Sequence, residues 1–286
     1  MAALQLTETA GRTSGRLPAS FVLGGAMLAF VFLAAIFGPL LAPFPYDRMD
    51  IMARMTPPDA THWLGTDEFG RDVLSRLLYG ARLSLLMGLG ATFVSLVIGV
   101  PLGLAAGYKG GRIDEAIMRA IDLVISVPPI LMGLLLLSLS TPNVWKTAFA
   151  VGIIYVPIMA RLTRAVTLEI AREEFVLAAR ARGERLWYIL AAEILPNAWP
   201  PIIVEAALRV TFAIMLGAAL SFLGLGVQPP RSDWGLMIAE ARPFIDSAPW
   251  IALAPGMLLC VTVIAVNLVG DGLRELLDPR LKRGRG

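Results

Sequence analysis

Long hydrophobic stretches separated by short polar blocks dominate this sequence. Six of these stretches are long enough to cross the roughly 30 Å hydrocarbon core of a membrane as α-helices. They cover residues 20–41, 83–107, 118–140, 147–165, 201–226 and 249–270. The pattern therefore predicts an all-α, polytopic membrane protein with six transmembrane helices.

The polar blocks divide the chain into three predicted regions. Residues 1–82 hold an N-terminal tail, the first span and an outer amphipathic segment. Residues 83–270 hold a five-helix core with a polar loop at 166–200, and residues 271–286 form a cytoplasmic tail. The first 19 residues are polar and the stretch that follows is of spanning length, so no cleavable signal peptide is expected.

The two outer blocks predict contacts with the membrane surface. Thr66 is a suitable N-cap for a helix in the first block. Apolar positions at helical spacing follow it: Val73, Leu74, Leu77 and Leu78. This helix is expected to lie along the membrane. Trp234 and Trp250, in and just after the second block, are expected at the membrane interface.

The distribution of basic residues predicts the orientation. If the N-terminus is inside, the inner segments hold 16 of the 25 Lys and Arg residues and the outer segments hold 8. Basic residues are enriched in cytoplasmic loops of membrane proteins. Both termini are therefore predicted to be cytoplasmic.

Composition excludes several classes of function. With 57% hydrophobic and 16% charged residues, the chain cannot be a soluble domain. Its single cysteine, Cys260, and single histidine, His62, provide neither a disulfide nor a metal cage nor an evident catalytic triad. The phosphate-binding pattern G-x-x-x-x-G-K-[ST] is missing, so ATP is expected on another chain. No nucleic-acid partner is expected from a net charge of only +3.

Small and helix-breaking residues inside the spans indicate a closely packed, bent bundle. Gly99, Gly103 and Gly107 share one face of the second span, where another helix can approach. Prolines at Val127-Pro128-Pro129 and at Pro157 predict kinks whose freed carbonyls need protein or water nearby. Such helices suit a bundle around a pathway, and ordinary tight packing explains any single position equally well.

The inner polar block from Arg161 to Trp199 is the segment most informative about function. Residues 169–182 are predicted to form one helix, Gly183 a sharp turn, and residues 184–195 a second helix that ends before Pro196. Small side chains at Ala178 and Ala179 leave a narrow surface that can enter a groove on a soluble partner. The alternative is a solvated loop whose charges only keep it inside.

A few polar residues within or beside the spans have alternative roles. Glu205 and Arg209 are spaced i,i+4 and form either a structural pair or part of an inner gate on the pathway. Asn267 is expected to bond a neighbouring helix more than a solute, although it remains a pathway candidate. Asp122 is expected to anchor a span edge or pair with an arginine, and His62 to lie exposed in a loop.

Four separated motifs resemble those of one family. Ala178-Ala179-x-x-x-Gly183, followed by Ile194-Leu195-Pro196, resembles the EAA loop of bacterial ABC importer permeases. Three further motifs resemble the dipeptide/oligopeptide/nickel permeases within that family, and specifically their C-type subunit. These are Leu64-Gly65-Thr66-Asp67 with Gly70-Arg71-Asp72 and Ser75-Arg76, Leu220–Gly226 with Pro229-Pro230 and Trp234-Gly235, and Asn267–Arg274 with Leu277-Asp278-Pro279-Arg280.

The resemblance implies a fold and a site. The fold is that of a type I ABC importer permease. The residues implied to contact the ATPase are Glu173, Glu174, Ala178, Ala179, Arg182 and Gly183. The outer-face motif comprises Gly65, Thr66, Asp67, Gly70, Arg71 and Asp72. Leu177 stands where the EAA loop has its glutamate, so Glu173 and Glu174 either replace that acid's contacts or those contacts are absent.

The resemblance also implies partners and a location. These are a second homologous permease, two cytoplasmic ATPase subunits that bind ATP and Mg, a periplasmic or lipid-anchored solute-binding protein, and lipid of the bacterial inner membrane. The solute is expected to be a di- or oligopeptide, with nickel or another non-peptide solute as the alternative. A secondary transporter and an intramembrane enzyme are less favoured, because paired carboxylates and inverted repeats are not evident.

Overall fold

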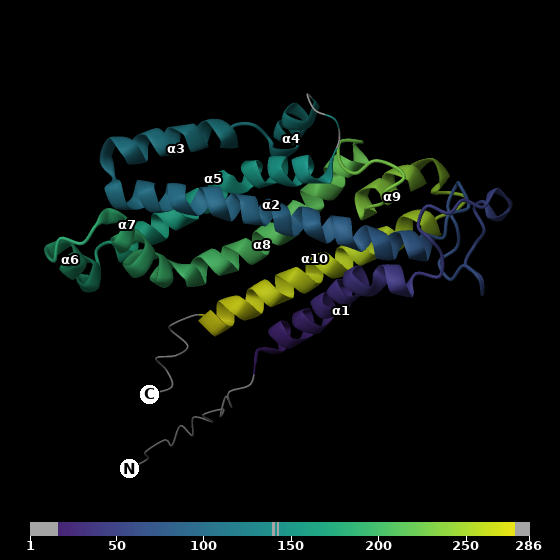
Figure 1. Ribbon diagram of the computed structural model, residues 1–286, viewed down its shortest axis with the longest axis horizontal. Helices are drawn as coiled ribbons and strands as arrows, with labels where there is room; N and C mark the ends of the chain where they lie inside the picture. The colour runs from purple at the N-terminus through teal and green to yellow at the C-terminus, as the bar shows by residue number, and fades with distance from the viewer. Residues whose placement is uncertain (1–16, 139–140, 142, 278–286) are drawn as a thin grey trace, which may run out of the picture.

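The computed structural model describes residues 17–138, 141 and 143–277, and within these residues it is a bundle of helices with one isolated bridge, Thr66–Asp72. Five long helices run along the bundle (Figure 1). They are α1 (Ala19–Leu41), α2 (Val73–Lys109), α5 (Val144–Ile170), α8 (Leu195–Phe222) and α10 (Trp250–Leu277). The shorter elements are η1 (Ile51–Ala53), α3 (Gly111–Ile125), α4 (Pro129–Ser138), α6 (Glu174–Ala181), α7 (Leu186–Tyr188), the π-helical η2 (Ile189–Ile194), α9 (Trp234–Ala241) and η3 (Arg242–Phe244).

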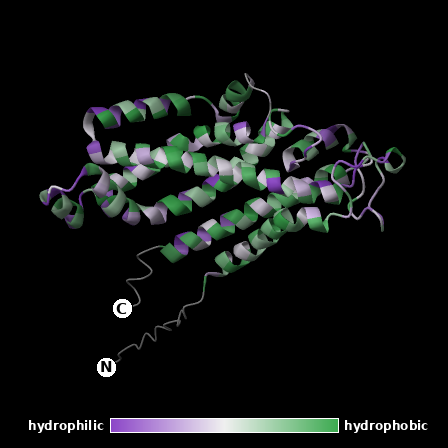
Figure 2. Ribbon diagram, viewed as in Figure 1, coloured by the Kyte–Doolittle hydropathy of each residue, from purple (hydrophilic) through white to green (hydrophobic). Residues whose placement is uncertain are grey.

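Five of the six predicted spans correspond to single helices of spanning length in the described part of the chain, and Figure 2 shows these helices as mainly hydrophobic. The sixth, residues 118–140, is not one straight helix, and its last two residues lie outside the described ones. It is the pair α3 and α4, bent by 87°. The consecutive prolines Pro128 and Pro129 explain the break, because proline lacks an N–H and disfavours helical geometry in the residue before it.

The predicted surface helix before the second span is instead the start of α2. Asp72, rather than Thr66, is the N-cap, and its carboxylate accepts a bond from the Ser75 N–H at 2.7 Å. Val73 and Leu77 are buried against α9 and α10. The prediction was wrong because the apolar stripe packs on protein, and α2 therefore runs for 37 residues across the predicted boundary at residue 82.

Trp234 is also buried in this core rather than at a membrane interface. Its indole Nε1 donates to the Leu77 carbonyl at 3.2 Å. Trp250 is partly buried, and its Nε1 donates to the Thr66 carbonyl at 3.2 Å. The two tryptophans therefore join α2 and the segment between α1 and α2 to the C-terminal helices.

The glycine face of α2 packs on α5, as predicted. A Cβ added at Gly103 would lie 2.5 Å from the Ala160 carbonyl oxygen, and one at Gly107 would lie 2.7 Å from the Thr167 Cβ. A Cβ added at Gly99 would likewise lie 2.7 Å from the Met159 Cβ. The absence of side chains at these positions lets the two backbones approach closely.

The bundle has two ends that differ in structure. At one end, called the α6 end below, α6 projects beyond the long helices, and the start of α1 lies beside the end of α10 (Figure 1). At the other, the α9 end, the segment between α1 and α2 packs beside α9. Residues 271–277 of the predicted tail are the last turns of α10, and the remainder lies outside the described residues.

Candidate functional site

The projection at the α6 end begins where the helical structure is interrupted between α5 and α6. α5 ends at Ile170 and α6 begins at Glu174, so the predicted single helix over residues 169–182 was wrong. Glu173 caps α6 through its carbonyl, which accepts from the Val176 and Leu177 N–H groups at 3.1 Å. Glu174 lies in the first turn, where a negative charge is favoured by the helix dipole.

Gly183 ends α6 with a Schellman motif. Its φ of +75° is in the left-handed region, and its N–H donates to the Arg180 carbonyl at 3.0 Å. The Glu184 N–H reaches back to the Ala179 carbonyl at 3.2 Å. This bond pattern requires a left-handed residue and so explains the predicted sharp turn.

The face that α6 presents differs from the prediction at Ala179. Val176 and Ala179 are buried against Ile189 and Ile194 of η2. Ala178 is exposed, together with Leu177, of which 49% is exposed. Because α6 starts five residues later than predicted and folds back on η2, Ala179 faces inward and Ala178 forms the outer surface.

Charged residues fix α6 to the bundle, and one of them was missed in the sequence. The Arg180 Nε donates to the Tyr108 hydroxyl at 2.9 Å, and its guanidinium lies 4.3 Å from that ring. Tyr108 is near the end of α2. Arg182 lies 3.6 Å from a carboxylate oxygen of both Glu184 and Glu193. The arginine–tyrosine contact links α6 directly to a long helix.

The predicted second helix over residues 184–195 does not end at Pro196. It consists of α7 and the π-helical η2, and it continues directly into α8. The Leu195 N–H bonds the Leu190 carbonyl, five residues back. The wider π turn precedes Pro196, which lacks an N–H and would clash with the carbonyl of a regular preceding turn.

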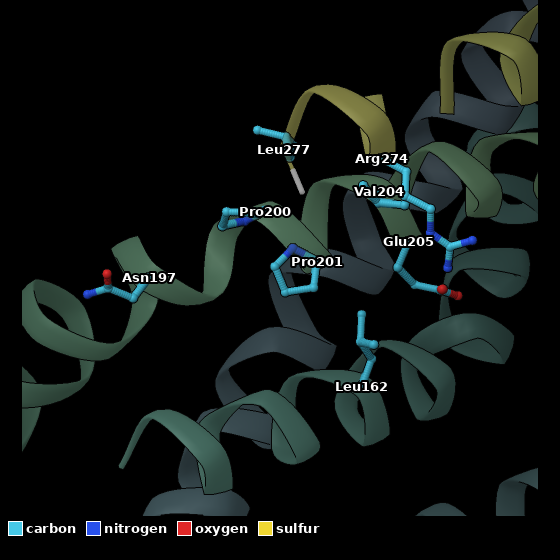
Figure 3. Close-up of a pocket in the computed structure, with 8 residues that line it drawn as sticks. All are labelled: Leu162, Asn197, Pro200, Pro201, Val204, Glu205, Arg274 and Leu277. Atoms are coloured by element: carbon cyan, nitrogen blue, oxygen red, sulfur yellow. The ribbon is translucent and has the colours of Figure 1, made fainter. Parts of the chain in front are cut away.

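A cavity of about 380 Å³ lies beyond this junction, between α5, α8 and α10 (Figure 3). Its lining is Leu162, Asn197, Pro200, Pro201, Val204, Glu205, Arg274 and Leu277. The predicted Glu205–Arg209 pair is present, with Arg209 Nε 2.8 Å from Glu205 Oε1. Arg209 also packs over the Phe212 ring at 4.7 Å, so the pair is largely enclosed by protein.

Asn267 contacts a neighbouring helix, as expected. Its Oδ1 lies 3.5 Å from the Thr211 Oγ1, which joins α10 to α8. The structure therefore brings Glu205 to a cavity, but places Asn267 in a contact between helices.

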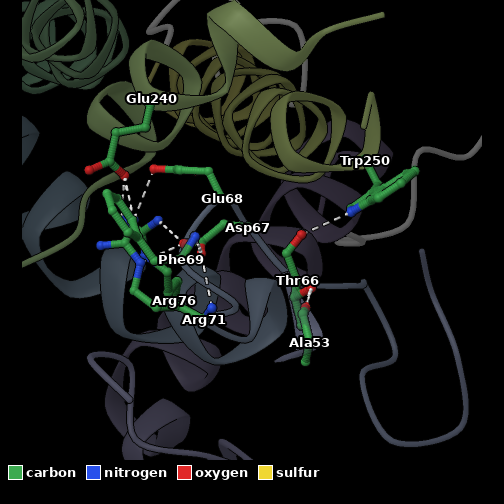
Figure 4. A network of polar contacts seen from close by, with 9 residues as sticks. All are labelled: Ala53, Thr66, Asp67, Glu68, Phe69, Arg71, Arg76, Glu240 and Trp250. Atoms are coloured by element: carbon green, nitrogen blue, oxygen red, sulfur yellow. Dashed lines mark hydrogen bonds and ion pairs between the residues drawn. The ribbon is translucent and has the colours of Figure 1, made fainter. Parts of the chain in front are cut away.

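At the α9 end, the predicted outer motif folds into a buried ionic cluster (Figure 4). Asp67 accepts from Arg71 Nε and from an Arg76 guanidinium nitrogen, each at 2.6 Å. Glu240 of α9 accepts from Arg76 at 2.6 Å and from Arg71 at 3.3 Å. Glu68 lies 3.2 Å from Arg71, and burial raises the pKa of its carboxyl. These five residues are called the ionic clasp below.

The other motif residues shape the backbone around the clasp. Gly65 and Gly70 have φ of +73° and +71°, and a Cβ at Gly70 would clash with the Asp50 carbonyl oxygen. The Thr66 hydroxyl donates to the Ala53 carbonyl. His62 Nδ1 lies 2.9 Å from a carboxylate oxygen of Asp72, and the His62 side chain is 13% exposed, so His62 is mostly buried instead of exposed as predicted. Glu240 was missed because it is more than 160 residues away in the sequence.

The comparisons with known proteins give the family. A model described as "binding-protein-dependent transport system inner membrane component" matches residues 99–283, and one described as "N-terminal TM domain of oligopeptide transport permease C" matches residues 20–58. The chain belongs to the binding-protein-dependent transport permeases. It is therefore a multi-pass inner membrane component of an ABC importer and not an enzyme.

Two relatives are similar to this permease over most of its length. The dipeptide transport system permease protein DppC of Alkalihalophilus pseudofirmus is 42% identical over 261 residues, which cover 91% of this chain and 86% of that protein. The di/tripeptide transport system permease protein DppC of Pseudomonas aeruginosa is 42% identical over 268 residues, covering 91% and 88%.

The fold of the permease resembles that of a solved transporter. An inward-facing structure of the MetNI methionine ABC transporter superposes with a TM-score of 0.59 and 19% identity. The superposition covers 71% of this chain and 96% of the other. The predicted type I ABC importer permease fold is thereby confirmed.

Proposed function

We propose that this permease forms half of the translocation pathway for di- or oligopeptides. The observation that carries the proposal is the likeness, over nine-tenths of the chain, to permeases named for dipeptide and di/tripeptide transport. It favours peptides over nickel, the alternative solute. The other half of the pathway is a second homologous permease.

The α6 projection is proposed to couple the pathway to ATP hydrolysis. A short helix with the exposed Leu177 and Ala178 is suited to a groove on an ATPase subunit. The contact of Arg180 with Tyr108 and the burial of Ala179 against η2 connect α6 to α2 and α8. Movement of α6 therefore reaches the long helices, which rock between inward-open and outward-open states.

The proposed site includes charged residues of the same projection. Glu173, Glu174 and Arg182 are exposed beside the outer face of α6, and the turn at Gly183 holds that face in place. Leu177 is exposed where the resembled EAA loop has a glutamate, so an apolar contact with the ATPase is proposed at this position.

The orientation follows from the coupling role. The α6 end is proposed to be cytoplasmic, which places both termini inside and the ionic clasp outside. Two ATPase subunits with ATP and Mg²⁺ then dock at the α6 end. A solute-binding protein, periplasmic or lipid-anchored, delivers peptide at the α9 end.

Co-purification tests the proposal. An affinity tag on this chain should retain a second permease and two ATPase chains from the native membrane, and a binding screen should give peptide affinity for the associated binding protein. Recovery of the chain without an ATPase would contradict the coupling role. A binding protein that takes Ni²⁺ and not peptides would contradict the solute.

A further inference from the structure

An exposed ion pair joins α3 to α5. Arg161 donates to the Asp122 carboxylate at 2.5 Å, and the two side chains remain 48% and 60% exposed. Arg161 and Asp122 lie inside the predicted spans 147–165 and 118–140, each four residues, or about 6 Å, from the inner end of its span. Charged side chains at that depth are costly against lipid and almost always face a bundle interior or a water-filled cavity.

The non-helical corner between α3 and α4 lies close to Asp122 of this pair in the sequence. Asp122 is one turn before the corner at residues 126–128, where α3 and α4 bend by 87°. Ser126 and Pro128 are exposed there. Non-helical backbone at membrane depth is tolerated only where it is covered by protein or lines water. The corner and the ion pair therefore indicate independently that this face is turned away from lipid.

Two other ion pairs in the bundle are more enclosed. Asp114 and Arg164 also join α3 to α5, through two bonds of 2.5 Å, with side chains that are 17% and 32% exposed. That pair already fastens α3 to α5 near the α6 end. The Glu205–Arg209 pair lies within one helix, packed on aromatic rings. Exposed ion pairs add little stability, so stabilising the packing of α3 on α5 is a poor explanation of the Asp122–Arg161 pair.

We propose that Asp122 and Arg161 line the solute pathway and bind the charged termini of a passing peptide. This inference rests on the proposed function. The Arg161 guanidinium bonds the C-terminal carboxylate and the Asp122 carboxylate bonds the N-terminal ammonium, in exchange for their bond to each other. Because the residues re-form their own pair when peptide leaves, binding stays weak enough for passage.

Thiol labelling of the assembled importer in proteoliposomes tests the location. Cys260, exposed on α10, is first removed by Cys260→Ala. Asp122→Cys and Arg161→Cys are then compared with Phe93→Cys, a control at an exposed apolar position near the middle of α2. A charged, membrane-impermeant thiosulfonate should react about a hundredfold faster at the first two positions, because it must enter hydrocarbon to reach the control. A transported dipeptide should slow both reactions.

Uptake assays test the peptide contact. Arg161→Gln should lower dipeptide uptake about fivefold at unchanged complex level, whereas Arg119→Gln, in an exposed pair on α3, should not. The double variant Asp122→Asn with Arg161→Gln should be at least as defective as Arg161→Gln alone. A merely structural pair predicts recovery in the double variant, since no charge is left unpaired.

Each contrary outcome identifies what has failed. Equally slow labelling at all three positions would overturn the inference and mean that the second permease covers the pair. Fast labelling without peptide protection, in an importer that takes up dipeptide, would overturn the contact with the termini. Fast labelling in an importer that takes up no dipeptide would overturn the proposed solute, and with it the peptide-binding part of the inference.

Discussion

Arg76 makes the strongest structural test, because its guanidinium joins three segments of the chain in the ionic clasp. Its side chain is 1% exposed and lies on α2, and it bonds Asp67, in the segment between α1 and α2, and Glu240 of α9, each at 2.6 Å. Arg76→Gln removes the charge and leaves both carboxylates short of a donor. Both that segment and α9 should then separate from α2 more readily.

The expected magnitude follows from the burial. Removing one partner of a buried ion pair costs about 3–5 kcal/mol, because the remaining charge is stranded. Asp67 and Glu240 keep Arg71, so the lower value of about 3 kcal/mol is expected here. For domains of 150–250 residues each kcal/mol lowers Tm by about 2–4 °C, which predicts a fall of about 6–12 °C.

Thermal unfolding of the purified complex measures this loss. The matched control is Arg119→Gln, which breaks a pair whose arginine is 77% exposed and is expected to cost roughly 0–1 kcal/mol. A Tm for Arg76→Gln that lies within one or two degrees of the control (about 0.5 kcal/mol) would show that the Arg76 charge does not stabilise the clasp. It would mean that water or neighbouring groups compensate for the loss of the Arg76 charge.

Three further predictions concern particular contacts. Burial raises the pKa of the Glu68 carboxyl. Its favourable contribution to the free energy of unfolding is therefore complete below the unfolded pKa of about 4.3 and is lost as the pH rises through the folded pKa. Glu68→Gln should make stability depend less on pH above about 4.3, and an unchanged pH profile of Tm would contradict this. Glu205→Gln or Arg209→Gln alone should reduce assembly more than the double change does, because one charge is then stranded, and additive losses in a double-mutant cycle would contradict the pairing. Gly103→Val should reduce the amount of complex in the membrane, because its side chain meets the Ala160 carbonyl, and a normal level on immunoblots would contradict the close packing.

The long elements could be predicted from the sequence because their signal is local. Long apolar runs predicted α1, α2, α5, α8 and α10, and the glycine spacing predicted that another helix packs closely on α2, although not that this helix is α5. The corner between α3 and α4 was visible only as two prolines. Its 87° bend depends on how α4 packs on the bundle, which no local pattern records.

The candidate sites were predicted less completely because their contacts are non-local. Residues 169–182 are mostly good helix formers, so the break before Glu174 had no local signal. It arises because α6 folds back on η2, and that packing also turns Ala179 inward. Glu240 belongs to the clasp although no spacing connects it with Asp67. Spacing alone did predict the Glu205–Arg209 pair, since i,i+4 contacts are local.

The proposed coupling of ATP hydrolysis to peptide uptake through α6 can be tested with one substitution. Ala178→Trp enlarges the exposed face of α6 without entering the chain's own core, and Ala29→Trp on the exposed face of α1 is the matched control. Uptake of labelled dipeptide is measured in proteoliposomes with the binding protein and ATP, together with ATP turnover. The unsubstituted and control importers should show ATP-dependent uptake. Ala178→Trp should lose both uptake and stimulated ATP turnover although its complex assembles. Normal uptake by Ala178→Trp would mean that the exposed face of α6 does not couple ATP hydrolysis to uptake.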